Sequence, residues 1–395
     1  MITFEEAVAL IAGSISPGSI ETQTLDRAAG RILAQAVTAQ IDSPRADVSA
    51  MDGYAVRDED LLSCPASLSI AGESFAGAGW AGRIESGQCV RIFTGAPVPE
   101  GADRVVIQEN VRREGDIAWF GEKPGSSRHI RKRGNDFQQE DELLSAGYRL
   151  DPRAIVTAAG ADLAKLQVYA RPRVTILSTG DELAEPGTAA ARTHAIPESV
   201  SFGVAALAEQ WGASVIARQR LADDVALMTE AAGSACAAAD LVIVTGGASV
   251  GEKDFAKRMF EPHGLELIFS KAAMKPGKPV WLGRAGDALV MGLPGNPTSA
   301  MVTARLLLAP LICRLTGREV KAALEWREAP LSASLPPCGG RETFHRARLA
   351  NGKVQLLSNQ DSSAQQALAS AEILVRQPPD GPEIPEGTLA PILDF

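Results

Sequence analysis

The sequence predicts a multidomain protein in which a central α/β domain with a mainly parallel sheet is combined with β-rich segments. Three observations lead to this fold class. The chain has 395 residues, which exceeds one ordinary core and suggests roughly two to four domains. Buried apolar runs alternate with helical patterns in its second half, as in a parallel sheet covered on both faces. Short apolar runs separated by glycine and proline lie on both sides of that segment and are typical of β modules.

The helical and β-rich segments of the first half are interleaved. Residues 1–40 and 141–170 carry helical Ala/Leu patterns, and we expect them to pack together as one helical domain. Thr3 and Glu6 fit a capping box that opens the first helix. Residues 41–140 are then expected to form a β-rich module inserted between these helices.

The second half is expected to hold two domains. Residues 171–318 form the α/β domain, whose strands include RVTILS, ASVIARQRL, DLVIVTG, LELIFS and ALVMGLPG. Residues 319–395 return to β texture and predict a small β-barrel or sandwich. Helices of the α/β domain are expected at about 198–211, 223–239, 254–261 and 297–316.

Composition and charge exclude several classes of protein. With 45% hydrophobic and 22% charged residues, the chain resembles a soluble globular protein. Its net charge of -9 argues against a general binder of nucleic acid or acidic membranes, because such a binder needs a basic face. An anionic ligand must therefore be held by local basic groups and backbone N–H groups.

The expected compartment is the cytoplasm. The N-terminus has no basic segment of a signal peptide. The longest apolar stretch, 300–315, is broken by Arg305 and Arg314 and is short of a membrane span. The 5 cysteines are scattered without CxxC-like spacing, so neither a disulfide framework nor a zinc site is indicated.

Three loops after strands of the α/β domain carry candidate binding residues. Ligands of open α/β sheets bind outside the carboxyl ends of the strands, where glycines let the backbone approach an anion. One such loop is common in any α/β fold, whereas three in one domain favour a binding site. None contains a Walker loop or a GxGxxG fingerprint. The candidates are Ser178, Thr179, Gly180, Gly246, Gly247, Ser249, Pro294, Gly295, Asn296, Pro297 and Ser299.

The run SKAAMKPGKPVWLG brings three lysines together, at Lys271, Lys275 and Lys278. Its prolines stiffen the backbone and so hold the lysines in place. A single lysine beside a turn is usually only solvated. Three within eight residues of an acidic protein favour a functional site for an anion.

Several carboxylates are candidates for Mg²⁺, which takes oxygen ligands and often bridges to substrate phosphates. Asp52 stands in MDGYA, which is also typical of a simple turn, and Asp136 ends a basic run of the kind that is usually solvated. We expect two or three of the group to lie in the site. The group comprises Asp52, Asp136, Asp181, Glu182, Asp223 and Asp254.

Taken together, seven runs resemble the motifs of the molybdopterin molybdenumtransferase family, which includes MoeA proteins and the gephyrin E-domain. In this order and spacing they are SAMDGYA, TGAPVPEGAD, RKRGND, STGDEL, TGGASVGEKD, KPGKP and GLPGNPTSA. The resemblance covers nearly the whole chain. It implies an elongated helical domain, an inserted β-rich domain, an α/β domain of the molybdopterin-binding fold and a C-terminal β-barrel. It also implies a homodimer whose clefts combine domains from both subunits.

The reaction that the resemblance implies is Mg²⁺-dependent. It takes adenylylated molybdopterin and molybdate, releases AMP and leaves molybdenum on the dithiolene sulfurs. Because the dithiolene is itself a soft sulfur chelate, no cysteine ligand is needed. The resemblance implies catalytic roles for Asp52, Thr94, Asp136, Glu182, Asp223, Asp254, Lys271 and Lys275, with Asp52, Glu182, Asp223 and Asp254 as metal ligands.

The same resemblance implies how the substrates are held. Molybdate is a compact dianion, which charged side chains bind by charge-assisted hydrogen bonds. The loop at 292–297 and the glycines at 246 and 247 would cradle the pterin and the phosphates. The residues for molybdate are Lys275, Lys278, Ser299 and either Arg341 or Arg346, with Ser362 or Ser363 at the edge of the site.

The sequence departs from the family pattern in two places. Glu198, Ser199 and Val200 stand where the family usually has a D-S/T-N run, and Ala222 replaces an arginine. Two alternatives to molybdenum insertion stay open: a molybdopterin adenylyltransferase, which shares the α/β domain, and a non-catalytic molybdopterin-binding scaffold. Expected transient partners are the adenylyltransferase of the pathway and recipient molybdoenzymes.

Overall fold

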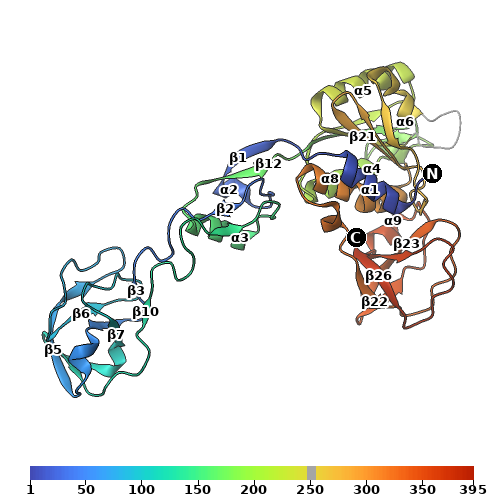
Figure 1. Cartoon of the computed structure of the whole chain (residues 1–395). Helices are drawn as coiled ribbons and strands as arrows, with labels where there is room; N and C mark the ends of the chain where they lie inside the picture. The colour runs from blue at the N-terminus through green and yellow to red at the C-terminus, as the bar shows by residue number, and fades with distance from the viewer. Residues whose placement is uncertain (247–254) are drawn as a thin grey trace. The chain divides into compact units, whose positions relative to one another are not determined.

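A computed structural model describes residues 1–246 and 255–395 of the chain (Figure 1). The chain divides into two compact units, each of which is described by itself. The first, called the α/β unit below, contains Met1–Glu21, Gly30–Ala34 and Val168–Phe395. The second, called the inserted unit, contains Thr22–Ala29 and Gln35–Gln167. The residues of the second unit thus lie between segments of the first along the chain, and they extend beyond the module predicted at 41–140. The finer division into four domains stays a prediction.

The centre of the α/β unit is a six-stranded sheet in the order β16–β13–β17–β21–β20–β18. The first four strands in this order pair in parallel, whereas β20 and β18 run antiparallel to their neighbours. The sheet is therefore mixed, and the prediction of a mainly parallel sheet is right only for those four strands. Strand β20 was not predicted. The bounds are β13 (Arg173–Thr179), β16 (Ser214–Leu221), β17 (Leu241–Thr245), β18 (Glu266–Phe269), β20 (Trp281–Ala285) and β21 (Ala288–Leu293).

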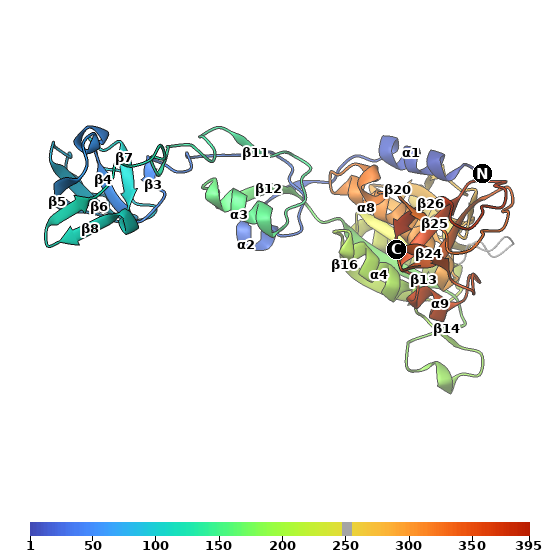
Figure 2. The ribbon, with the colours of Figure 1, turned by 90° about the horizontal axis from the view of Figure 1, so that it is seen from below.

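Helices cover both faces of this sheet, which explains why its strands read as continuous apolar runs. Side chains alternate along a strand, so Leu241 and Ile243 of β17 face one core and Val242 and Val244 face the other. Helix α4 (Val200–Gln210) runs beside β13 and β16 (Figure 2). The other helices of the unit that we predicted are α5 (Val225–Ala238), α6 (Phe255–Arg258), α7 (Pro297–Thr303) and α8 (Ala309–Leu315).

The N-terminal helix α1 (Phe4–Ser14) belongs to the α/β unit and packs beside α8 (Figure 1). The predicted capping box is confirmed, because the Thr3 hydroxyl accepts the Glu6 N–H at 3.1 Å and the Glu6 carboxylate accepts the Thr3 N–H at 2.8 Å. Phe4 of α1 is buried in the same core as the central sheet. Residues 141–167, with which the sequence had led us to expect this helix to pack, belong to the inserted unit.

The remaining helices predicted for 1–40 and 141–170 are only partly present. Helix α2 (Leu25–Ala28) is a single turn, and it packs against α3 (Pro152–Gly160) in the inserted unit. Two segments predicted as helical are strands instead, β1 (Ile20–Thr24) and β12 (Lys165–Tyr169), which pair with each other. Alternating exposed and half-buried side chains along β1 fit this pairing.

One helical segment among the described residues is long and apolar enough to cross a membrane by length and composition alone. It is Pro297–Leu315, with 19 residues and a mean hydropathy of 1.4, and 89% of it is buried inside the structure. Core helices of globular proteins have the same properties. Arg305 interrupts the apolar run, and its guanidinium donates to the carbonyls of Ala323 and Asp394, both at 2.7 Å.

The C-terminal part of the α/β unit is a second sheet in the order β19–β23–β25–β26–β22, with β24 paired to β23. A bridge between Leu331 and Val354 joins the end of β22 to β24 and brings the two sides of the sheet together around a common core. Strand β19 joins this sheet to the lysine-containing loop. The bounds are β19 (Met274–Lys275), β22 (Arg327–Pro330), β23 (Glu342–Ala350), β24 (Lys353–Leu356), β25 (Ile373–Gln377) and β26 (Leu389–Asp394).

The inserted unit contains a six-stranded sheet in the order β7–β4–β6–β5–β9–β8. Its two faces bury separate apolar clusters, one with Tyr54 and Phe120 and the other with Val90 and Ile92. Two short pairs, β3 (Val48–Ser49) with β10 (Ile130–Arg131) and β2 (Val37–Thr38) with β11 (Glu142–Leu144), extend the unit. The bounds of the main sheet are β4 (Gly53–Val56), β5 (Ala66–Ser74), β6 (Gln88–Ile92), β7 (Arg104–Ile107), β8 (Val111–Glu114) and β9 (Ile117–Phe120).

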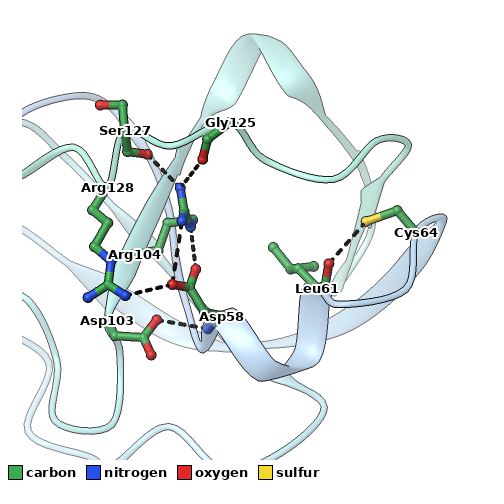
Figure 3. A network of polar contacts seen from close by, with 8 residues as sticks. All are labelled: Asp58, Leu61, Cys64, Asp103, Arg104, Gly125, Ser127 and Arg128. Atoms are coloured by element: carbon green, nitrogen blue, oxygen red, sulfur yellow. Dashed lines mark hydrogen bonds and ion pairs between the residues drawn. The ribbon is translucent and has the colours of Figure 1, made fainter.

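A buried arginine at the start of β7 fixes the segment before β10 (Figure 3). Arg104 is 8% exposed and donates to the carbonyls of Gly125 and Ser127 at 2.7 and 2.6 Å. Its guanidinium also forms an ion pair with Asp58, whose other oxygen accepts from Arg128 at 3.1 Å. Every charged group of this network has a partner, so we assign it a structural role.

Candidate functional site

A cavity of 1330 Å³ lies at the carboxyl ends of β13, β17 and β21 in the α/β unit. This is the edge of the sheet where an α/β fold usually binds its ligands. All three predicted loops and the lysine-containing run contribute to its wall. The predicted site residues that line it are Thr179, Gly180, Glu182, Asp223, Gly246, Lys275, Lys278, Pro294, Gly295, Asn296, Pro297, Ser299, Arg341, Arg346, Ser362 and Ser363.

Glycines allow the three strand-end loops to touch one another. Gly246 has φ +88, and a Cβ there would lie 2.5 Å from the carbonyl oxygen of Thr179. A Cβ on Gly295 would lie 3.3 Å from the Cα of Gly246. No larger residue fits at Gly246 without moving the backbone. Because glycine has no side chain, an anion can approach the backbone N–H groups of this loop. Ser178 is buried beneath the loops, where its hydroxyl accepts from Thr245 at 3.1 Å.

The cations of the cavity come from two segments. Lys275 and Lys278 are exposed, and β19 pairs Lys275 with Thr343 of β23. Between the lysines, Gly277 has φ +112, and a Cβ there would lie 2.4 Å from the hydroxyl oxygen of Thr303. The loop therefore packs closely against α7. This contact fixes the backbone positions of both lysines. Lys271, which the sequence also favoured, is not among the residues that line the cavity.

Arg346 lines the cavity, yet its guanidinium is used to hold the protein together. It is 1% exposed and donates to the Thr298 hydroxyl at 3.2 Å and to the carbonyls of Asn359 and Asp361 at 3.2 and 3.0 Å. For Arg341 the structure records no such bonds of the guanidinium within the described residues. Of the two arginines left open by the sequence, Arg341 is therefore the better candidate for an anion.

The loop at 358–365 brings both predicted serines to the edge of the cavity. Asn296 donates its side-chain amide to the Ser362 hydroxyl at 2.9 Å. The hydroxyl and the backbone N–H of Ser363 donate to one oxygen of Asp361, at 2.6 and 2.8 Å. These two hydrogen bonds lower the pKa of the Asp361 carboxyl. The carboxylate is thereby occupied within its own loop.

Gln360 and His345 are among the cavity residues that the sequence analysis did not predict. Gln360 donates its amide to the Arg346 carbonyl at 2.8 Å and accepts the Arg346 N–H at 3.0 Å, which continues the pairing of β23. His345 shares a hydrogen bond of 2.9 Å with the side-chain oxygen of Gln377. Burial lowers the pKa of His345, and the nearby charge of Lys275 acts in the same direction. The signal for Gln360 lay in the run SNQDSS, of which only the serines were singled out.

Two carboxylates of the predicted metal set, Glu182 and Asp223, line the cavity and are exposed. The Glu182 carboxylate lies against Gly180, where a Cβ would be 2.8 Å from its oxygen. Asp181 instead accepts the Asp223 N–H at 3.0 Å and so joins the two loops. Within residues 1–246 and 255–395, no group of three or more His, Cys, Asp or Glu side chains could hold a metal ion. Asp254, Gly247 and Ser249, also predicted for the site, lie outside the described residues.

The inserted unit carries the other predicted residues. Asp52 and Thr94 are brought together, because one Asp52 oxygen accepts both the backbone N–H and the hydroxyl of Thr94 at 2.7 Å. These hydrogen bonds, together with the charge of Arg91, lower the pKa of the Asp52 carboxyl. Asp136 is exposed, and its backbone N–H donates to the Ser43 carbonyl at 2.9 Å.

Three of the residues that depart from the family pattern, Glu198, Ser199 and Val200, lie on the cavity wall, whereas Ala222 is not among the lining residues. Glu198 is 6% exposed and accepts the Ser201 N–H at 2.8 Å, so it caps the start of α4. Ser199 accepts from the side chain of Gln365 at 3.3 Å, and Val200 is buried in the core. In place of the polar residues of the family's D-S/T-N run, this wall therefore has a carboxylate that caps α4, from Glu198, and a buried apolar side chain, from Val200.

Three family models match the chain and together define its class. The model of the MoeA N-terminal region (domain I and II) matches residues 2–161, and that of the MoeA C-terminal region (domain IV) matches 328–395. Between them, residues 175–314 match a probable molybdopterin binding domain. The fold and the cavity thus belong to a multidomain protein of the MoeA type.

Proteins of similar sequence and structure identify the family within this class. A molybdopterin molybdenumtransferase of Haemophilus influenzae is 38% identical over 353 residues, which is 88% of this chain and 85% of the relative. Molybdopterin molybdenumtransferase 2 of Mycobacterium tuberculosis is 34% identical over 387 residues and 95% of both chains. A crystal structure of the molybdopterin biosynthesis MoeA protein from Pyrococcus horikoshii OT3 has a TM-score of 0.86 at 25% identity over 100% of both chains. The chain belongs to the molybdopterin molybdenumtransferase family, a family of transferases of molybdenum cofactor biosynthesis.

Proposed function

We propose that the protein inserts molybdate into adenylylated molybdopterin and releases AMP in a Mg²⁺-dependent step. The observation that carries this proposal is the composition of the cavity in the α/β unit. Lys275, Lys278 and Arg341 supply positive charge there, glycine-lined strand ends supply backbone donors, and two carboxylates lie on the same wall. A substrate that is anionic at several points along its length fits this arrangement.

Molybdate is held in this proposal by the lysines and Arg341. Charge-assisted hydrogen bonds to a compact dianion are short and strong, and neither lysine is buried against the protein. Ser299 lies in the first turn of α7 and adds a hydroxyl to the same wall. Arg346 acts indirectly, because it fixes the loop that carries Ser362 and Ser363.

The phosphates lie along the strand-end loops in this proposal. Gly246 and Gly295 leave the backbone open to an approaching phosphate. In the reaction, water adds across the phosphoanhydride bond, which leaves AMP and the phosphate of molybdopterin. The two thiols of molybdopterin then bond to molybdenum, and one oxo group of molybdate leaves with their two protons as water.

Glu182 and Asp223 are the described residues that would hold Mg²⁺. Mg²⁺ binds through one or two carboxylates plus substrate phosphates, so two carboxylates beside a phosphate site fit its donor preference. When bound, the ion neutralises charge that develops on the phosphate oxygens. Asp254 and Asp52 stay predictions as further ligands, as do the catalytic roles of Thr94, Asp136 and Lys271.

The proposal also covers the oligomeric state of the enzyme, its cellular compartment and its protein partners. We propose a homodimer in the cytoplasm that transiently contacts the adenylyltransferase of the pathway and recipient molybdoenzymes. The family resemblance and the scattered cysteines support this part. Analytical ultracentrifugation of the purified chain tests the dimer directly, and a monomer at micromolar concentration would contradict the proposed homodimer.

The test of the proposed reaction uses the purified full chain with adenylylated molybdopterin, Mg²⁺ and molybdate. We expect AMP release, together with activation of a molybdenum-free apoenzyme that receives the product. Chelation of Mg²⁺ should stop both. Absence of AMP release under every metal condition would reject the proposal. Attachment of AMP to molybdopterin from ATP would favour the adenylyltransferase alternative, and tight binding without turnover would favour the scaffold.

A further inference from the structure

Two phenylalanines are stacked at one end of the sheet in the inserted unit. The ring centroids of Phe75 and Phe93 are 4.7 Å apart with an interplanar angle of 12°. The residues follow the ends of β5 and β6, which pair in parallel with Ser74 opposite Ile92. Phe75 is 46% exposed, and neither ring belongs to the two apolar clusters of the unit. This stack therefore contributes little to the core and leaves aromatic surface open to solvent.

The exposed ring is held in place by a tight turn. The backbone N–H of Phe75 donates to the Ala78 carbonyl at 3.1 Å, and the Ala78 N–H donates back to the Phe75 carbonyl at 3.0 Å. Gly77 closes this turn with φ +79, a conformation that favours glycine. The Phe93 N–H donates to the Ser74 carbonyl at 3.2 Å and fixes the second ring against the first. Because the backbone at both rings is already fixed, a ligand that stacks there orders few new groups.

Polar groups of the predicted site surround the same stack. The guanidinium carbon of Arg91 lies 4.8 Å from the Phe93 centroid, and Arg91 donates to the Gly53 carbonyl at 3.0 Å. Thr94, which follows Phe93 directly, donates to Asp52. One member of the Asp52–Thr94 pair therefore directly follows, along the chain, the ring against which Phe75 is stacked. An aromatic surface beside a carboxylate and a hydroxyl suits a heterocycle with polar edges better than a purely apolar group.

We propose that the stack of Phe75 and Phe93 is a binding subsite for a planar heterocycle of the substrate, which stacks on the exposed ring of Phe75. This inference rests on the proposed function, because adenylylated molybdopterin contains two such rings, the adenine and the pterin. The two rings share the chemistry that the subsite recognises, a flat π-system with N–H groups at its edge. Stacking on an aromatic side chain is worth about tenfold or more in affinity for one ring.

The test measures binding of AMP and of a simple pterin, separately, to the full chain and to Phe75→Leu. The leucine keeps an apolar side chain but removes the aromatic face. We expect about tenfold weaker binding of one of the two probes, and the affected probe identifies the ring. Phe75→Trp should restore the affinity, since tryptophan offers a larger π-surface. Equal affinity of wild type and Phe75→Leu for both probes would overturn the inference, and so would a failure of Phe75→Trp to rescue a loss.

Trp119→Leu is the matched control. Trp119 is an aromatic residue of β9 in the same unit, 38% exposed, with Arg112 over its ring at 5.8 Å. It lies outside the stack, so its removal should leave both affinities unchanged. An equal loss in Trp119→Leu would show general surface adsorption and would overturn the inference. Melting temperatures of all variants should match the wild type.

Failure of this inference is distinguishable from failure of the proposed function. Binding of free rings is read without turnover, whereas AMP release is read from the complete reaction. Ring binding that depends on Phe75 in a chain that releases no AMP would keep the subsite and reject the reaction. AMP release with an unchanged KM in Phe75→Leu would keep the reaction and reject the subsite.

Discussion

At the carboxyl ends of β13, β17 and β21, the large cavity is lined by Lys275, Lys278 and Arg341, for which the structure records no ion pair within residues 1–246 and 255–395. At the amino ends of the same strands, a second cavity of 750 Å³ is also lined by charged residues, and two of these, Arg173 and Asp240, form an ion pair. Asp240 accepts the backbone N–H of Arg173 at 2.7 Å and its guanidinium at 2.9 and 3.3 Å. The two ends thus have similar residue types and different arrangements.

The two ends differ in whether their charged groups are already paired within the protein or can still bind a ligand. Partial burial would raise the pKa of the Asp240 carboxyl, but the hydrogen bonds and the charge of Arg173 outweigh it and lower that pKa. The pKa of Arg173 is raised by the same pair. At the carboxyl ends, neither Lys275 nor Lys278 has a side-chain hydrogen bond or ion pair with another part of the chain that the structure describes, so their donors can serve a ligand. A concave surface with charged groups is therefore evidence for a binding site only when those groups are not paired with each other.

The largest effect is expected from Arg346→Met. Loss of the buried guanidinium removes three hydrogen bonds, to the Thr298 hydroxyl and to the carbonyls of Asn359 and Asp361, and a hydrogen bond to a charged group contributes about 1.5–3 kcal/mol. We expect the free energy of unfolding to fall by about 3 kcal/mol, measured by urea denaturation. Arg341→Met serves as control and should change stability by less than about 0.5 kcal/mol. Equal losses in the two variants would contradict the different roles assigned to these arginines.

The next effect is expected for Lys275→Ala. A hydrogen bond to a charged group contributes about 1.5–3 kcal/mol, so molybdenum incorporation should fall by about 10-fold to 100-fold. The protein should keep its melting temperature, since the side chain is exposed. The readout is the amount of molybdenum bound per molecule of cofactor.

Two other lysine variants sharpen that result. Lys271 lies outside the cavity lining, so the geometry of the cavity predicts that Lys271→Ala retains activity within about twofold, whereas the sequence predicts a loss. Lys353 is exposed on β24 and gives a matched control for the loss of one surface charge. A loss in Lys271→Ala as large as that in Lys275→Ala would support the original sequence prediction against the geometry of the cavity.

A pair of glycines tests the two ends of the sheet with the same substitution. Gly246 and Gly286 both have positive φ, +88 and +59, so alanine costs about 1 kcal/mol of backbone strain at either place. Only at Gly246 does the new Cβ collide with a neighbour, because at Gly286 nothing lies within 4 Å. Gly246→Ala should therefore raise KM for the adenylylated substrate about tenfold, and Gly286→Ala should not. Similar kinetics in the two variants would show that the loop at Gly246 is not in contact with substrate.

Part of this site could be predicted from sequence because its signals are local. Glycine and proline directly after apolar runs marked the three loops, and parallel strands bring their carboxyl ends to one edge. The state of Arg346 could not be predicted, because its acceptors are backbone carbonyls at 359 and 361, which no residue type reveals. His345 was missed for a similar reason, since only the fold places it beside Gln377.

The fold, like the site, was predicted correctly where local sequence patterns determine it and wrongly where contacts between distant segments determine it. Capping and helical periodicity identified α1, α4 and α5 correctly. The same periodicity failed at 20–24 and 165–169, where pairing between the two segments makes strands of sequences with helical patterns. The position of α1 was also missed, because the burial of Phe4 against a core more than 170 residues later is a tertiary contact.

The smallest effect is expected at the amino ends, for Asp240→Asn. The carboxylate is 45% exposed, and exposed ion pairs contribute about 1 kcal/mol or less. The pKa of Asp240 is lower in the folded chain than its ordinary value of 3.8. Its contribution to stability is therefore fully present above pH 3.8 and is lost as the pH falls through the lower, folded-state pKa. Urea denaturation of wild type and Asp240→Asn should give a small, constant difference around neutral pH that disappears in acid. A difference that grows in acid would mean that the carboxylate is not stabilised by Arg173, and the contrast between the two ends of the sheet would fail.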